Sequence, residues 1–279
     1  MSTINLNGIN LNLEIYGDGP PLIALHGFTG SSSTWHPLAQ AIQSTNTIFA
    51  VDLIGHGASS KPRNSARYSM ERTVEDLLTM LNILGLPRAN WLGYSMGGRI
   101  ALSLGLQAPD KCTSLILEST SPGIKDASSR RARVNTDEDL AMLLESQGIV
   151  AFESLWASLP LWASQARLSN ETKQSLKSQR LSNDPQALAA SLRGIGSGRQ
   201  PYVGDKVSSL AVPTCFIAGE EDEQYRRLAL SMAREVKKGK AVIVANAGHA
   251  LHLEQPETFQ KTISAFLNDK KMQKELPND

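Results

Sequence analysis

Short apolar runs, separated by polar or glycine-containing segments, recur along most of the chain. From Ile4 to Ile15 apolar and polar residues alternate around Asn7-Gly8, which predicts a β-hairpin. The later apolar runs are short and bounded by turn residues, so they predict buried strands. These runs are Leu22–Leu25, Thr47–Val51, Ala89–Leu92, Ser114–Leu117, Val212–Ala218 and Ala241–Val244.

Helical periodicity alternates with these runs. The segment Met70–Leu84 has apolar residues at helical spacing, and Ser69 offers an N-cap. A second helical run, Gly98–Leu106, follows the strand at Ala89–Leu92. Alternating short strands and helices are typical of a mostly parallel sheet with helices on both faces. We therefore expect an α/β fold.

The pattern changes between residues 121 and 205, where strand-like runs disappear. Helical segments are expected around Glu138–Leu144, Ile149–Leu155 and Leu188–Leu192. Such an insertion would form a lid that excludes water and selects the substrate. We divide the chain into the first half of an α/β core (1–120), a helical lid (121–205), the second half of the core (206–268) and a charged tail (269–279).

The composition is that of an ordinary globular protein, with 279 residues and a formal net charge of +1. This charge gives no general attraction to nucleic acid or anionic membranes, and no apolar run is long enough to cross a bilayer. The segment Met1–Asn12 lacks the basic start and apolar centre of a signal peptide. Cys112 and Cys215 lie in or beside apolar runs, which indicates buried, reduced thiols. We expect a cytoplasmic monomer without metal or cofactor.

A serine lies directly between a strand and a helical run in Gly93-Tyr94-Ser95-Met96-Gly97. A strand that turns at once into a helix needs small neighbours, which the two glycines provide. This arrangement, a nucleophile elbow, holds the serine hydroxyl above the sheet edge. It also directs the free N–H of Met96 toward an oxygen that becomes negative during a reaction. We predict that Ser95 is catalytic.

An acid is expected after a later strand, because triads with such an elbow follow the order serine, acid, histidine. The run Val212–Ala218 ends in Gly219-Glu220-Glu221-Asp222, a loop at the carboxyl edge of the sheet. By its position in the loop, Asp222 is the predicted acid. The neighbouring carboxylates are alternatives whose simpler role is a solvated loop surface: Glu220, Glu221 and Glu223.

The predicted base is His249, which follows the strand Ala241–Val244 in a loop that can reach Ser95. His26 ends an early strand in Leu25-His26-Gly27-Phe28, where the N–H of Phe28 is the second candidate oxyanion donor. We expect His26 to order that loop. The remaining histidines are expected to brace a turn or to be ordinary surface or packing residues: His56 in the first role, His36 and His252 in the second.

Arginine outnumbers lysine in the lid. Between residues 121 and 200 there are seven arginines (130, 131, 133, 167, 180, 193 and 199) and three lysines (125, 173 and 177). A guanidinium is a fixed fork suited to carboxylate or phosphate. Most of the seven are expected to pair with lid carboxylates (Asp137, Glu138, Asp139 and Glu145), and two or three to face a ligand. Arg99, four residues after Ser95, lies on the same helical face and is a further candidate for an anionic group.

Several motifs occur together over nearly the whole chain. They are Gly93-Tyr94-Ser95-Met96-Gly97-Gly98-Arg99; Ser121-Pro122-Gly123-Ile124 with Arg133 downstream; Leu159-Pro160-Leu161 after Trp156; Gln179-Arg180-Leu181; Gly194-Ile195-Gly196-Ser197-Gly198; and Gly248-His249-Ala250-Leu251-His252-Leu253-Glu254. In this combination the chain resembles the 2-succinyl-6-hydroxy-2,4-cyclohexadiene-1-carboxylate synthases, lyases of the alpha/beta-hydrolase fold. The lid motifs are far more discriminating than the triad, which many hydrolases share in outline.

The resemblance implies elimination of pyruvate from the polycarboxylate 2-succinyl-5-enolpyruvyl-6-hydroxy-3-cyclohexene-1-carboxylate, a step of menaquinone or phylloquinone biosynthesis. Ser95, His249 and Asp222 would act as a base that removes a proton next to the succinyl ketone. The N–H groups of Phe28 and Met96 would stabilise the dienolate oxygen. Whether Ser95 or His249 takes the proton directly is left open by the sequence.

The resemblance also implies the substrate-binding residues. They are a carboxylate-binding set of Arg99, Arg133 and Arg180, and the pocket residues Tyr94 and Trp156. Arg130 and Arg131 are close enough in sequence to compete with Arg133 for its role. One departure lies next to the acid, where Gln224-Tyr225 replaces the lysine and phenylalanine that similar enzymes often have.

Two other functions are compatible with these residues. A serine hydrolase acting on an anionic small molecule, either an esterase or a carbon-carbon bond hydrolase, would share the triad. A non-catalytic receptor for an anionic small molecule could keep the same pocket. The arginine content of the lid favours the lyase over the hydrolase. Only a measurement of turnover distinguishes the non-catalytic receptor from the enzymes.

Overall fold

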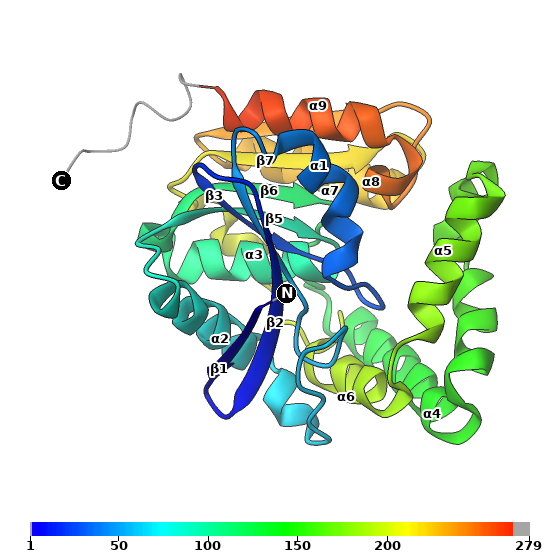
Figure 1. The fold of residues 1–279 in the computed structure, drawn as a ribbon. Coiled ribbons are helices and arrows are strands. Elements are labelled where there is room, and N and C mark those ends of the chain that lie inside the picture. The colour runs from blue at the N-terminus through cyan, green and yellow to red at the C-terminus, as the bar shows by residue number, and fades with distance from the viewer. Residues whose placement is uncertain (1, 270–279) are drawn as a thin grey trace.

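The computed structural model describes residues 2–269, which form one sheet covered by helices and extended by a helical insertion (Figure 1). The strand order is β1-β2-β4-β3-β5-β6-β7-β8. β2 runs antiparallel to β1 and β4, and the other pairs are parallel. The strands are β1 (Ser2–Leu6), β2 (Ile9–Tyr16), β3 (Pro21–Leu25), β4 (Thr47–Val51), β5 (Ala89–Tyr94), β6 (Cys112–Glu118), β7 (Thr214–Gly219) and β8 (Gly239–Val244). The predicted α/β fold is confirmed.

Each predicted apolar run lies within a strand, except at the start of β7. β7 begins at Thr214 and not at Val212. Pro213 has no N–H to donate to a sheet ladder, although its carbonyl still accepts a hydrogen bond from the Leu115 amide at 2.9 Å. Strand prediction from apolar runs therefore succeeded except where proline interrupts the hydrogen bonding.

Helices cover both faces of the sheet and bury two separate cores (Figure 1). Along β3, Ile23 and Leu25 belong to one core, whereas Leu22 and Ala24 belong to the other, because successive side chains of a strand point to opposite faces. One face carries α2 (Met70–Ile83), α3 (Met96–Gln107) and α7 (Glu223–Glu235), and the other carries α1 (His36–Ile42) and α9 (Pro256–Leu267). The shorter helices are η1 (Ser32–Trp35), η2 (Ser65–Tyr68), η3 (Pro109–Lys111), η5 (Gly204–Ser209) and α8 (Leu251–Glu254).

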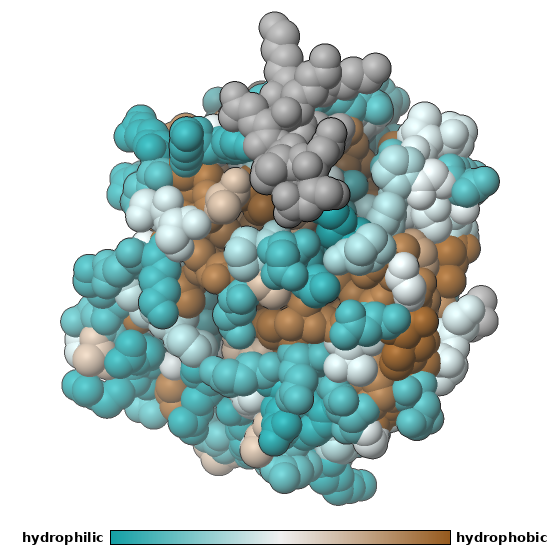
Figure 2. Space-filling model, turned by 90° about the vertical axis from the view of Figure 1, so that its left-hand side faces the viewer, coloured by the Kyte–Doolittle hydropathy of each residue, from teal (hydrophilic) through white to brown (hydrophobic). Residues whose placement is uncertain are grey.

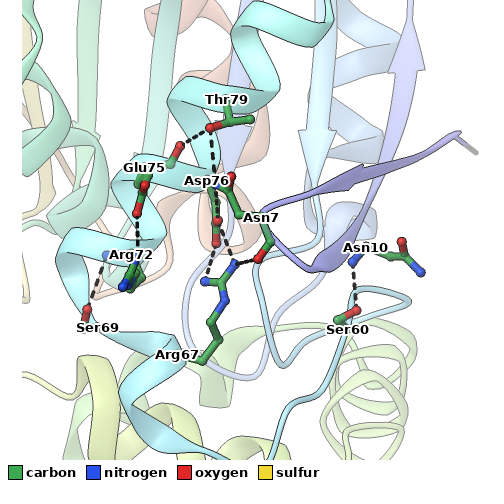
Figure 3. A network of polar contacts seen from close by, with 9 residues as sticks. All are labelled: Asn7, Asn10, Ser60, Arg67, Ser69, Arg72, Glu75, Asp76 and Thr79. Atoms are coloured by element: carbon green, nitrogen blue, oxygen red, sulfur yellow. Dashed lines mark hydrogen bonds and ion pairs between the residues drawn. The ribbon is translucent and has the colours of Figure 1, made fainter.

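The opening hairpin is fastened to α2 by hydrogen bonds from Asn7, beside an ion pair between η2 and α2. Asn7 and Gly8 have positive φ angles of 44° and 77°, as the predicted Asn-Gly turn requires. Arg67 donates two hydrogen bonds to Asp76, at 2.7 and 2.8 Å, and the Asn7 side chain donates a third at 3.0 Å (Figure 3). Arg67 and Asp76 satisfy each other's charge and hydrogen bonding, so the surface hollow that they line has a structural role.

The insertion between β6 and β7 consists of α4 (Ala127–Ala157), η4 (Pro160–Arg167), α5 (Asn170–Leu181) and α6 (Pro185–Ile195). α4 is broken at Gly148 (φ 78°, ψ −175°), so the two predicted segments Glu138–Leu144 and Ile149–Leu155 lie on either side of a kink. α5 was not predicted, because its residues are polar nearly all round and only Arg180 is buried. These helices project from one side of the sheet (Figure 1), and α4 and α6 share a small core that includes Phe152 and Trp156.

Cys112 and Cys215 are buried and unpaired, and burial raises the pKa of each thiol to about 12, so the predicted reduced thiols are confirmed. Among residues 2–269, no helix combines the length and apolarity needed to cross a membrane. On the side turned away from α4 and α5, hydrophilic residues surround the hydrophobic ones (Figure 2). The predicted tail lies outside the described residues from position 270 onward.

Candidate active site

Ser95 occupies a strained turn between β5 and α3. Its backbone angles are φ 49° and ψ −103°, a region that non-glycine residues rarely adopt. A methyl group at Gly93 would overlap the Gly97 carbonyl, and one at Gly97 would overlap the Leu25 carbonyl. The elbow is therefore possible because both flanking residues lack a side chain, as the sequence pattern indicated.

Three side chains from distant segments meet above this turn. His249 Nε2 lies 3.1 Å from Ser95 Oγ, and His249 Nδ1 lies 2.7 Å from Asp222 Oδ2. The His249 and Asp222 side chains are buried, with exposed fractions of 1% and 8%. Because the carboxylate accepts a hydrogen bond, Nδ1 carries the proton and Nε2 is free to accept the serine proton. The arrangement is that of a serine, histidine and acid triad.

The neighbouring carboxylates of the acid loop point elsewhere. Glu221 accepts a hydrogen bond from Arg167 at 2.9 Å, and Glu223 pairs with Arg227 on α7. Asp222 also accepts a hydrogen bond from the Tyr225 amide at 3.3 Å, so this one carboxylate caps α7 and contacts His249. Among the four predicted candidates, Asp222 is the one that reaches the histidine.

The loop that carries His249 is held by two side chains, those of Glu254 and Ser119. Glu254 accepts hydrogen bonds from the amides of Gly248 and Ala250, at 2.7 and 3.1 Å, and Ser119 Oγ donates to the His249 carbonyl at 2.8 Å. These bonds hold the backbone on both sides of the imidazole. The same bonds give partners to two backbone amides and one carbonyl that would otherwise lack them beside a cavity.

The loop after β3 supplies the second candidate oxyanion donor. His26 is completely buried, its Nε2 accepts a hydrogen bond from the Leu53 amide at 3.0 Å, and its Nδ1 lies 2.7 Å from the Gly27 carbonyl. Burial lowers the pKa of His26, which keeps the ring in this neutral form. Among the described hydrogen bonds, none uses the amide of Phe28 or of Met96 as donor. Both N–H groups are thus available to a ligand.

A cavity opens over Ser95 and His249, and its wall combines two cations with aromatic rings. Arg99 and Arg133 are the cations. The aromatic residues are Phe28, Tyr94, Trp156, Trp162 and Tyr225. Its volume of about 80 Å³ is below the roughly 300 Å³ of the smaller ligand sites.

Arg99 is fixed from behind by the end of the lid. Its side chain is buried, and Nη1 donates to the Ile195 carbonyl at 2.9 Å and to Gln200 Oε1 at 3.1 Å. Burial lowers the pKa of Arg99 to about 10, so the group remains charged at neutral pH. The predicted position on the elbow face is confirmed, since the Arg99 amide donates to the Ser95 carbonyl one turn earlier.

Arg133 reaches the same cavity from α4. Its Nε donates a hydrogen bond to Asp137 at 2.8 Å. The Asp137 side chain is nearly inaccessible to solvent, and it also accepts a hydrogen bond from the Gly198 amide at 3.4 Å. The contact with Asp137 uses one nitrogen of the guanidinium, and the Arg133 side chain lines the cavity. Arg130 instead donates to the Ile124 carbonyl at 3.4 Å and lines no part of this cavity, as is true of Arg131.

Arg180 lies apart from Arg99 and Arg133. It borders a neighbouring cavity that shares Phe28, Tyr94 and Trp162 with the first. Its guanidinium carbon is 5.4 Å from the Trp162 ring centre, its nearest carboxylate is Glu153 at 3.9 Å, and its buried Nε has no partner among the described residues. The three arginines expected to act together are thus separated by the indole of Trp162.

The other lid arginines mostly form ion pairs, as expected. Arg193 bridges Glu138 and Glu145 with contacts of 2.5 to 3.1 Å, and Arg167 contacts Glu221. Two aromatic residues of the cavity were missed by the sequence analysis, Trp162 and the hydroxyl-bearing Tyr225. Trp162 lies in η4, whose short helical turn gives no clear hydrophobic period. Tyr225 was noticed as a departure near the acid but not as part of the site.

His252 has the packing role expected of it, and it packs beside the catalytic histidine. It is buried, its Nδ1 lies 2.9 Å from Glu118 Oε1, and its ring packs edge-on against Tyr94 with centres 4.6 Å apart. Tyr94 in turn contacts the His249 ring. His252 is therefore a packing residue of the site. His36 is a surface residue that pairs with Glu14 at 2.5 Å.

Comparisons with known proteins agree with this geometry. Residues 20–256 match the family model of the alpha/beta hydrolase fold. A Bacillus subtilis (strain 168) protein, provisionally named a 2-succinyl-6-hydroxy-2,4-cyclohexadiene-1-carboxylate synthase, is 36% identical over 96% of this chain and 99% of its own length. A synthase of the same name from Salmonella newport (strain SL254) is 29% identical over 89% of this chain and 94% of its own.

A solved structure, that of MenH from S. aureus, superposes with a TM-score of 0.89 and 31% sequence identity, covering 93% of this chain and 98% of that one. The likeness therefore extends through the core and the lid and is not confined to the triad. The chain belongs to the alpha/beta-hydrolase fold family and, within it, to the 2-succinyl-6-hydroxy-2,4-cyclohexadiene-1-carboxylate synthases.

Proposed function

We propose that the protein eliminates pyruvate from 2-succinyl-5-enolpyruvyl-6-hydroxy-3-cyclohexene-1-carboxylate and forms 2-succinyl-6-hydroxy-2,4-cyclohexadiene-1-carboxylate, as the names of its relatives suggest. One observation carries the proposal: the Ser95 and His249 pair shares a cavity with two arginines, Arg99 and Arg133. A base beside fixed cations suits a substrate with several carboxylates. An esterase for neutral substrates would gain nothing from burying a guanidinium there.

The triad acts as the base of this reaction. His249 accepts the proton of the carbon next to the succinyl ketone, either directly or through Ser95, and the bonding electrons move onto the ketone oxygen as a dienolate. When the dienolate collapses, the bond between the ring and the enolpyruvyl oxygen breaks, and the proton returns to the leaving group. Asp222 supports this cycle by holding the imidazole in the required tautomer.

The dienolate oxygen needs stabilisation, and the amides of Phe28 and Met96 are proposed to supply it. The Met96 amide is the first of α3, where the helix dipole also favours negative charge. Removal of one such donor costs roughly 3 to 4 kcal/mol in known oxyanion holes. Preorganised amides of this kind lower the barrier without reorganisation during the reaction.

Substrate binding is assigned to the cations and rings of the two cavities. Arg99 and Arg133 would hold a carboxylate near the triad, while Tyr94 and Trp156 line the space beside it. Arg180 would bind a second carboxylate beyond Trp162, where its buried Nε is without a partner among the described residues. All of these groups come from one chain, which supports a monomer as the working unit, testable by light scattering. A cytoplasmic location stays a prediction of the sequence.

The test is release of pyruvate from the enolpyruvyl precursor, followed through lactate dehydrogenase, with an aryl acetate assayed in parallel. Pyruvate formation with negligible ester hydrolysis supports the lyase. Rapid hydrolysis of the ester without pyruvate would reject it in favour of a lidded serine esterase. Saturable binding of the precursor without either reaction would identify a receptor.

A further inference from the structure

Tyr225 stands between the catalytic histidine and the two arginines of the cavity. It lies in the first turn of α7, and its ring meets the His249 ring at 4.6 Å with an interplanar angle of 65°. The same residue lines the cavity that contains Arg99, Arg133 and Ser95. Contact with the imidazole thus explains why an aromatic ring lies here, but it does not explain why the ring carries a hydroxyl.

The Tyr225 hydroxyl has no hydrogen-bond partner among residues 2–269, although the backbone amide of the residue bonds to Asp222. Two other tyrosines use their hydroxyls inside the fold: Tyr68 donates to the Pro62 carbonyl at 2.8 Å, and Tyr16 donates to Glu14. Burial raises the pKa of Tyr225, while the nearby Arg99 and Arg133 oppose that rise. The hydroxyl therefore stays protonated at neutral pH and can donate into the cavity.

The two arginines leave room for another donor. Arg99 uses Nη1 on the Ile195 carbonyl and Gln200, and Arg133 uses Nε on Asp137. A carboxylate offers about four lone-pair positions, more than two partly occupied guanidiniums readily fill in a fixed geometry. A neutral hydroxyl can satisfy one of them without adding like charge beside two cations.

We propose that the Tyr225 hydroxyl donates a hydrogen bond to the ligand carboxylate held by Arg99 and Arg133, which makes Tyr225 a specificity-determining residue for anionic substrates. The proposal rests on the proposed function only in requiring a carboxylate at this position. It concerns ground-state binding, because the hydroxyl belongs to the arginine subsite and the proton transfer is assigned to His249.

The decisive variant is Tyr225→Phe, which removes the hydroxyl and keeps the ring against His249. Its matched control is Tyr202→Phe, since Tyr202 packs beneath Lys125 and does not line the cavity. Succinate serves as the anionic probe and succinamide as its uncharged counterpart. Binding is followed by tryptophan fluorescence, because Trp156 and Trp162 line the cavity.

We expect Tyr225→Phe to weaken succinate binding about tenfold, the cost of one hydrogen bond to a charged group. Tyr202→Phe should bind succinate like the wild type, and succinamide should not distinguish the three proteins. Equal succinate affinity in the wild type and Tyr225→Phe, or no succinate binding by the wild type, would overturn the proposal.

The kinetics of turnover provide a second test of the role of Tyr225. With the enolpyruvyl precursor, Tyr225→Phe should raise KM about tenfold and leave kcat within about twofold. A fall in kcat at unchanged KM would assign the hydroxyl to the reacting atoms and overturn the binding role. If the wild type releases no pyruvate, the proposed function fails, while the succinate titration still decides the role of Tyr225.

Discussion

The backbone amide of Arg99 donates a hydrogen bond to the carbonyl of Ser95 at 2.9 Å. This bond closes the first turn of α3, the helix whose first amide belongs to Met96. The serine, an oxyanion donor and a buried cation are therefore fixed to one another by a single helical turn. Any displacement of α3 moves all three groups together, so the elbow sets the position of the anion site as well as that of the serine.

Replacement of Ser95 by alanine should abolish most of the activity without unfolding the protein. Loss of a group that takes part in proton transfer costs about 100- to 10,000-fold, and we expect kcat for pyruvate release to fall by this factor. The melting temperature should not fall, because the side chain caps no helix and its one hydrogen bond among residues 2–269 is to His249. An unchanged elimination rate would remove Ser95 from the mechanism.

Arg133→Ala should weaken use of the polycarboxylate substrate. We expect a rise in KM of about tenfold or more, since a charge-assisted hydrogen bond is lost, and a much smaller effect on hydrolysis of a neutral aryl ester. Arg193→Ala is the matched control on the same lid, because its guanidinium is occupied by Glu138 and Glu145. Similar KM values for the two variants would count against the anion subsite.

The glycines after Ser95 should tolerate alanine to different degrees. A methyl group at Gly97 would meet the backbone carbonyls of Leu25 and His26, which cannot move without displacing β3 and its loop. One at Gly98 would first meet the Thr120 hydroxyl, a side-chain atom. We therefore expect Gly97→Ala to lower the melting temperature more than Gly98→Ala, both within the range of overpacking costs, about 1 to 3 kcal/mol.

A double variant checks this explanation. Thr120→Ala should recover part of the stability lost in Gly98→Ala, because it removes the nearest atom, and should recover none of the loss in Gly97→Ala. Thermal unfolding of Gly97→Ala, of Gly98→Ala and of the two double variants that add Thr120→Ala measures both effects. Equal recovery in the two backgrounds would show that the overlap is not the cause.

Stability should fall in mild acid because of a buried histidine. Burial lowers the pKa of His56 to about 3, against about 6.5 in an unfolded chain. Between these values the unfolded state binds more protons, so the free energy of unfolding decreases as pH falls, by at most about 1.4 kcal/mol per unit. The effect is absent above about pH 7.

Urea unfolding at several pH values between 7.5 and 4.5 measures this dependence. His56→Gln cannot take up the proton, so the stability of the variant should decline less steeply than that of the wild type over the same range. Its stability at pH 7.5 provides the reference for any packing cost of the substitution. Parallel curves for the two proteins would mean that other groups cause the acid sensitivity.

Several features of the site could be predicted from local sequence because they depend on local sterics. Ser95 is marked by the two glycines without which its turn overlaps the neighbouring backbone. The positions of Asp222 and His249 follow from strand ends, since parallel strands bring their following loops to one edge of the sheet. Arg99 follows from helical spacing alone.

Other features depended on how the insertion packs. Arg130, Arg131 and Arg133 are equivalent in sequence, but only Arg133 faces the cavity, because α4 turns the others away. α5 carries no apolar period and was missed, and Arg180 on it lies beyond Trp162. No local pattern specifies which face of a polar helix meets a neighbour.

The sequence by itself determined the α/β sheet, the elbow at Ser95 and the order of the triad, because periodicity, chain reversal and glycine sterics act over a few residues. Tertiary structure alone decided that Arg99 and Arg133 share a cavity, that Arg180 lines a neighbouring one, and that the Tyr225 ring lies against His249 in the first. Those choices come from packing of the lid against itself and against the two halves of the core, where side-chain volume and buried charge set the arrangement.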